Sequence, residues 1–140
     1  MVVRIPRKII EEMSLHAVNT YPEEGCGLLI GVTNSGVREI IKCIPMPNVY
    51  AGPRHNRYSI DPLEYMKIED QQYRDGLMVL GVFHSHPDAP AVPSTYDQEH
   101  AVPTFSYVIL SVRKGRVEEI AAWRMDESTW RFEEEQLEIV

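Results

Sequence analysis

Residues 77–87 read Leu-Met-Val-Leu-Gly-Val-Phe-His-Ser-His-Pro, and this stretch decides the fold. The apolar, β-favouring run 77–84 is typical of a strand that is buried on both faces, which is a central strand of a sheet. The run ends directly in the motif that holds His84 and His86. We therefore expect a sheet built around this strand, with chemistry at the strand's end.

The remaining patterns place further elements on both sides of this strand. Asp61 and Pro62 provide a helix cap and a first-turn proline, and Gly76 ends that helix. The patterns predict helices over 6–19, 61–75 and 94–101, and strands over 26–32, 37–44, 57–60, 105–112, 117–125 and 129–133. This order predicts an α/β fold of the mixed α+β kind. We expect a single domain over 1–140 with a mostly antiparallel mixed β-sheet flanked by helices.

Composition excludes several classes of protein. The chain has 140 residues, 14 Lys and Arg against 21 Asp and Glu, and a net charge of −7, which disfavours a nucleic-acid partner. Hydrophobic residues make up 44% and charged residues 25%, as in an ordinary globular domain. No apolar run approaches the ~20 residues of a membrane span, and no signal-peptide core is visible, so we expect a cytoplasmic protein without a membrane partner.

Two minor features have simple interpretations. Cys26 and Cys43 lie in strand-like segments, so we expect buried reduced thiols rather than a disulfide. The acidic run 133–135 is interpreted as a solvated surface.

His84, His86 and Asp97 form the candidate metal site. Strand alternation points the two histidines to the same side, and Asp97 follows eleven residues later on a short helix. Two imidazoles and one carboxylate have the number and type of ligands that a catalytic zinc with one open position takes. The alternative is an exposed His-x-His loop and a helix acid of the first turn.

Three more residues are candidates for the same chemistry. Ser94 lies one helical turn before Asp97, which places its hydroxyl near the metal, and it is also an ordinary N-cap; the two roles are compatible. Glu23 and Glu24 precede the strand 26–32, where either carboxylate near the metal is a candidate general base. Two solvated loop acids are the alternative interpretation.

Together these residues resemble the signature of the JAMM (MPN+, Mov34/PAD-1-like) metalloprotease family. That signature is a glutamate, then His-x-His-Pro, six residues, Ser, two residues and Asp, and every position is filled here. The resemblance implies an architecture similar to JAMM proteins and cytidine deaminases, and one catalytic Zn²⁺. It further implies that His84, His86 and Asp97 are the zinc ligands, Glu24 the general base and Ser94 the donor to the oxyanion.

The resemblance also implies a substrate class. Small prokaryotic members of the family hydrolyse the amide bond after the C-terminal glycine of a ubiquitin-like or sulfur-carrier protein, and some remove cysteine from such a carrier. We therefore expect a carrier with a Gly-Gly tail as the partner. The proline-rich loop 45–58 contains the candidate substrate-binding residues Arg54, His55, Arg57 and Tyr58. A solvated connecting loop is the alternative.

Four other functions remain to be weighed. A nucleobase deaminase is disfavoured because its His-x-Glu and Pro-Cys-x-x-Cys elements are absent. A DNA-repair role is disfavoured by the acidic charge. A non-catalytic scaffold of the MPN type, or a zinc amidase that acts on small peptides, is the alternative to a carrier-specific peptidase.

Overall fold

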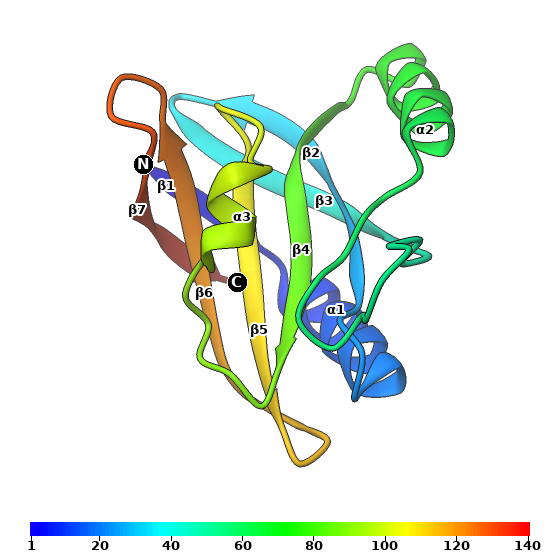
Figure 1. Ribbon diagram of the computed structural model, residues 1–140. Helices are drawn as coiled ribbons and strands as arrows, with labels where there is room; N and C mark the ends of the chain where they lie inside the picture. Colours follow the sequence, from blue (N-terminus) through cyan, green and yellow to red (C-terminus); the bar gives the residue numbers. More distant parts are fainter.

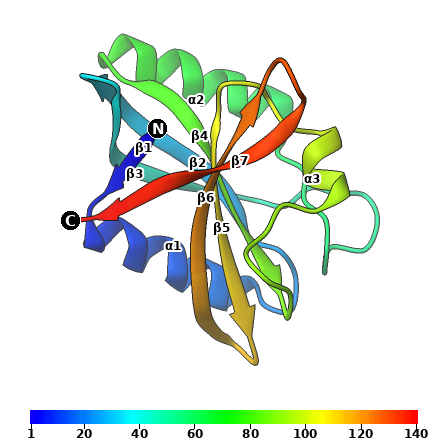
Figure 2. The same cartoon turned by 90° about the vertical axis from the view of Figure 1, so that its left-hand side faces the viewer.

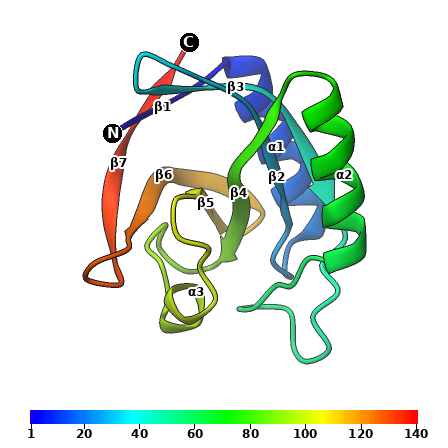
Figure 3. The same ribbon diagram turned by 90° about the horizontal axis from the view of Figure 1, so that it is seen from above.

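The computed structural model describes residues 1–140 and contains seven strands and three helices (Figure 1). The strands are β1 (Val2–Ile5), β2 (Cys26–Asn34), β3 (Val37–Met46), β4 (Met78–Pro87), β5 (Ser106–Arg113), β6 (Arg116–Asp126) and β7 (Arg131–Ile139). The helices are α1 (Arg7–Thr20), α2 (Pro62–Arg74) and α3 (Thr95–Glu99). The strands close into a barrel in the order β1-β3-β2-β4-β5-β6-β7, and the ring is visible from above (Figure 3).

The expected mixed, mostly antiparallel sheet is confirmed. β4 pairs in parallel with β5 and antiparallel with β2, so it is a central strand. The closure of the barrel was not expected, because it depends on β1, which pairs in parallel with both β3 and β7. The four residues of β1 are too few to produce a clear periodic pattern before Pro6.

The central strands bury both of their faces. Leu29 on β2 belongs to the same apolar cluster as Met13 of α1, whereas its neighbour Leu28 belongs to a second cluster that includes Ile68 of α2. Consecutive side chains of a strand point to opposite faces, which explains this division. Figure 2 accordingly shows α1 and α2 on opposite sides of these strands.

Three expectations about individual elements need correction. Residues 57–60 are irregular rather than a strand, since the loop runs without regular structure from 47 to 61. β4 runs to Pro87 rather than ending at His84, so the whole His-x-His motif belongs to the strand. The run 133–135 lies in β7, where Glu135 is only 2% exposed and is paired with Arg124.

Other expectations about side chains are confirmed. Asp61 caps α2 by accepting hydrogen bonds from the amides of residues 63 and 64, and neither cysteine is in a disulfide. Cys26 is buried as expected, whereas Cys43 is only half-buried. No helix has the length and apolar character that a membrane crossing requires. The cytoplasmic location stays a prediction.

Candidate active site

Two histidines of β4 form the centre of the site. His84 and His86 are 1% and 7% exposed, and their ring centroids lie 5.1 Å apart. Their common side follows from strand alternation. β5 pairs with β4 at both histidines, and β2 pairs with β4 as far as His84, so the strand that holds the two imidazoles is fixed by its neighbours.

Glu24 reaches the histidines from the segment before β2. The Ser85 amide donates to the Gly25 carbonyl, and the Gly25 amide donates to the Ser85 hydroxyl, so this segment is fixed against β4. The Glu24 side chain is 2% exposed, and its Oε1 lies 3.2 Å from Nδ1 of His84. Glu23 is exposed. The structure therefore brings Glu24, and not Glu23, to the site.

Asp97 closes the site from α3. Its Oδ2 lies 3.1 Å from Nε2 of His86, and its Oδ1 lies 3.9 Å from Nε2 of His84. Ser94 and Asp97 form a reciprocal capping box, in which each backbone amide donates to the other side chain. The N-cap role of Ser94 is thus confirmed, while its role as an oxyanion donor stays a prediction.

The protonation of His86 shows that this donor set fits a metal cation. Nδ1 of His86 lies 2.8 Å from the Pro90 carbonyl, which only accepts, so Nδ1 carries the hydrogen. In the neutral ring, Nε2 then presents a lone pair to the Asp97 carboxylate, and two acceptors in contact require a cation between them. The ligand atoms of Glu24, His84 and His86 also lie within 4.8 Å of one another. Nitrogen and carboxylate ligands of this kind suit zinc.

The pKa shifts of His86 and Asp97 also indicate that the site favours positive charge. Burial by itself lowers the pKa of His86, but hydrogen bonds with Asp97 and with the Pro90 carbonyl raise it above its ordinary value. Burial by itself raises the pKa of Asp97, but His84, His86 and the Ser94 amide together hold it well below its usual range. Asp97 is therefore an ionised ligand candidate, and a proton on His86 supplies positive charge that a metal would otherwise bring.

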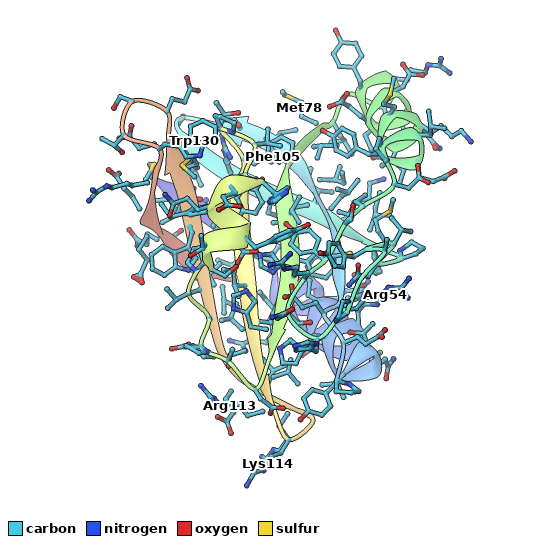
Figure 4. All side chains as sticks on the ribbon, in the orientation of Figure 1. Arg54, Met78, Phe105, Arg113, Lys114 and Trp130 are labelled. Atoms are coloured by element: carbon cyan, nitrogen blue, oxygen red, sulfur yellow. The ribbon has the colours of Figure 1, made fainter.

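The loop 47–61 contributes one of its four predicted substrate-binding residues directly to the site. The Tyr58 ring stacks on His84, with centroids 4.5 Å apart and an interplanar angle of 26°. Arg57 is exposed and lies over the Tyr96 ring at 4.7 Å. Arg54 and His55 are exposed, and Arg54 lies on the outer side of the loop (Figure 4). A substrate role for these four residues stays a prediction.

An apolar cavity of about 470 Å³ opens beside Asp97 and Tyr58. Its other lining residues are Leu28, Ser59, Ile60, Pro62, Tyr65, Val82, Tyr96, His100, Val102, Phe105 and Tyr107. Most of these aromatic side chains were not expected at the site, since they come from four separate segments whose meeting depends on the barrel. In the sequence, only Tyr96 beside Asp97 and Tyr58 beside Arg57 indicate that aromatic side chains surround the site.

The comparisons with known proteins agree with this geometry. Residues 6–126 match the family of prokaryotic homologues of the JAB domain. The chain is 38% identical to a probable TtuB-protein conjugate cleaving protease of Thermus thermophilus over 109 residues, which cover 78% of this chain and 70% of that protein. It is 38% identical to a desampylase of Haloferax volcanii over 64% of this chain and 63% of that protein. It is 30% identical to the CysO-cysteine peptidase of Mycobacterium tuberculosis over 89% of this chain and 83% of that protein.

Solved structures share the architecture. A Desulfitobacterium hafniense protein superposes with a TM-score of 0.84 at 29% identity, over 99% of this chain and 92% of that one. A JAB1/MPN domain protein of Archaeoglobus fulgidus superposes with a TM-score of 0.62 at 20% identity, over 98% of each chain, and shares the fold. The fold and the site thus define a JAB-domain protein. The chain belongs to the prokaryotic JAB family and is a metallo-hydrolase of the JAMM type.

Proposed function

We propose that this protein is a zinc-dependent peptidase that hydrolyses the amide bond after the C-terminal glycine of a ubiquitin-like or sulfur-carrier protein. The observation that carries the proposal is the buried contact of His84, His86, Asp97 and Glu24, in which Nε2 of His86 meets the Asp97 carboxylate at 3.1 Å. A scaffold without chemistry gains nothing from this contact, because buried acceptors that face each other are costly without a cation.

Each residue of the cluster has a defined task. His84, His86 and Asp97 would hold Zn²⁺, which when bound polarises the scissile carbonyl and lowers the pKa of water toward ~7. Glu24 takes the proton of the attacking water and delivers it to the leaving amine. The Ser94 hydroxyl accepts from the Asp97 amide, and its own hydrogen is therefore free to point at the oxyanion, an interaction worth ~3 kcal/mol.

The substrate class is supported by the surroundings of the cluster and by the relatives. The loop 47–61 and α3 lie on the same side of the barrel, and the hydroxyl of Tyr96 donates to the Tyr58 carbonyl between them (Figure 3). A tail that ends in Gly-Gly has no side chains and fits a narrow passage to the histidines, so specificity falls to the folded body of the carrier. Three relatives are named as enzymes that cleave conjugates or a carrier-bound cysteine.

The test is hydrolysis of carrier adducts by the zinc-loaded enzyme, followed by mass spectrometry. The substrates are a ubiquitin-like sulfur carrier that bears a C-terminal cysteine or a short peptide after Gly-Gly, and the same carrier with a Val-Gly tail. We expect cleavage after the terminal glycine and a sharp loss of rate with the β-branched residue.

Each remaining result decides against part of the proposal. Binding of the carrier without cleavage of any adduct would identify a scaffold. Short unrelated peptides that are cut as fast as the carrier adducts would identify a zinc amidase of broad specificity. Equal rates for Gly-Gly and Val-Gly tails would show that no narrow passage selects the tail.

A further inference from the structure

The side chain of Asn48 uses its full hydrogen-bonding capacity within the loop 47–61 and beyond it. Its Nδ2 donates to the carbonyls of Glu24 and Arg57, both at 3.0 Å. Its Oδ1 accepts from the amides of Tyr50 and Ser59, both at 3.1 Å. An asparagine amide offers two donors and two lone pairs, so every position is occupied.

These bonds connect the loop to the backbone of the predicted base. The Glu24 carbonyl accepts from Asn48, and the Glu24 amide donates to the Arg54 carbonyl at 2.7 Å. On its other side, the segment is held to β4 by the two bonds between Gly25 and Ser85. The Glu24 backbone is therefore held from two sides, by the loop 47–61 and by β4.

The same side chain fixes the aromatic residue that covers His84. Asn48 bonds to the backbone of Arg57 and of Ser59, which are the two neighbours of Tyr58. The Tyr58 ring is the one that stacks on His84 at 4.5 Å. A single amide thus connects Glu24, which meets Nδ1 at the edge of the His84 ring, to the backbone on either side of Tyr58, which stacks on the face of that ring.

We propose that Asn48 is a positioning residue that makes the loop 47–61 and Glu24 one rigid unit, so that a carrier tail seated on the loop aligns the base. The inference rests on the proposed function, because it assigns Glu24 the role of base and the loop the role of tail-binding surface. Asn48 itself touches neither the metal ligands nor the reacting atoms, and it acts through the position of Glu24.

The variant Asn48→Asp tests this arrangement with little change of shape. The aspartate keeps an acceptor for the amides of Tyr50 and Ser59, but it places a second oxygen against the carbonyls of Glu24 and Arg57. We expect kcat for the carrier adduct to fall about 30-fold, since a small displacement of a catalytic group costs up to ~10²-fold. Zinc content should stay unchanged. Asn34→Asp makes the same chemical change at an exposed turn and should leave kcat unchanged.

A double substitution separates positioning from a general loss of structure. If Asn48 acts through Glu24, then Asn48→Asp added to Glu24→Gln lowers the residual rate no further. An additional 30-fold loss in the Glu24→Gln background would overturn the proposal. If Asn48→Asp does not fold, Asn48→Ala, which adds no charge, is to be used in the same cycle.

A second measurement does not depend on hydrolysis. Amide hydrogen exchange at Glu24 should accelerate at least 10-fold in Asn48→Asp, because the loop that accepts its hydrogen is released, while the Ser85 amide stays protected by Gly25. Unchanged exchange at Glu24 would overturn the proposal even in an active enzyme. If no carrier adduct is cleaved but exchange responds as expected, the proposed function fails and the coupling of loop and glutamate stands.

Discussion

The barrel contains two buried clusters of ionisable side chains, and they differ in their charge balance. In the first, Glu135 is paired with Arg124 and accepts from the Ser106 hydroxyl at 2.7 Å. Arg38 donates in turn to the Ser106 hydroxyl at 2.9 Å and to the Leu80 carbonyl at 3.1 Å. This cluster brings its own permanent cations, and its side chains come from β3, β5, β6 and β7.

The second cluster has no permanent cation. Glu24 and Asp97 are buried with two imidazoles, which are ordinarily neutral near pH 7. Their contacts are satisfied only when a proton or a metal ion enters. The comparison teaches that burial of charged residues does not by itself indicate a functional site. Buried acids that lack a permanent cation indicate such a site, and a buried acid that is already paired with its cation indicates structure.

The largest expected effect is that of Glu24→Gln on hydrolysis. The amide has the size of the carboxylate but cannot accept the proton of water, so turnover should fall at least ~10³-fold while fold and zinc content persist. Rates with carrier adducts and elemental analysis are the measurements. Glu23→Gln is the control, since Glu23 is exposed, and a larger loss in that variant would move the base to Glu23.

Removal of a metal ligand should have the next largest effect. His84→Ala and Asp97→Ala should each weaken zinc binding by ~100-fold or more, because two protein ligands do not hold an open zinc site. Metal content after dialysis measures the loss, and a chelator should abolish the activity of the unmodified protein. Full zinc occupancy in both variants would contradict the ligand assignment. Glu135→Gln should retain its zinc, since that cluster is complete without a metal.

Glu135→Gln should instead affect stability. Loss of the carboxylate leaves the Arg124 guanidinium inside the barrel without its partner, which we expect to cost about 2 kcal/mol. This figure lies below that of a fully buried pair because the Arg124 side chain is 18% exposed. Denaturant unfolding measures the change. Glu134→Gln on the exposed face of β7 is the matched control. An equal loss of stability in the two variants would show that the buried pair of Glu135 and Arg124 does not stabilise the fold.

The sequence predicts the two clusters unequally well. The residues of the metal site follow fixed spacings along the chain, and the strand that holds His84 has a continuous apolar run. Asp97 and Ser94 follow at helical spacing, which local rules describe well. The position of Glu24 rests on the family signature, because strand alternation alone does not place it beside His84.

The remainder depends on contacts that are distant in sequence. Glu135 lies in an acidic run that is typical of a surface, and its burial follows from the pairing of β7 with both β6 and β1. Asn48 lies in a loop that has no periodic pattern, and three of its four partners become neighbours only when the loop is folded back. Local propensity does not contain this information, since the final contacts are set by barrel closure.

The smallest expected effect concerns the hydrogen bonds of Asp126, Ser128 and Thr129. Because this group is in contact with water, it shows how weakly such bonds act outside the two buried clusters. The Asp126 carboxylate accepts from the Ser128 hydroxyl at 2.6 Å and from the amides of Ser128 and Thr129, and these bonds lower its pKa. A depressed pKa in the folded state stabilises the protein above the unfolded value of ~3.9, and this contribution disappears as pH falls through the folded value.

Ser128→Ala removes the hydroxyl but keeps both amides, so the pKa of Asp126 should rise only part of the way toward its ordinary value. An NMR titration of the carboxyl carbon measures the change, and Ser128→Thr, which keeps a hydroxyl, should titrate like the unmodified protein. Activity and zinc content should not respond, because neither Asp126 nor Ser128 lines the site cavity. An unchanged pKa in Ser128→Ala would show that the two amides alone stabilise the charged carboxylate.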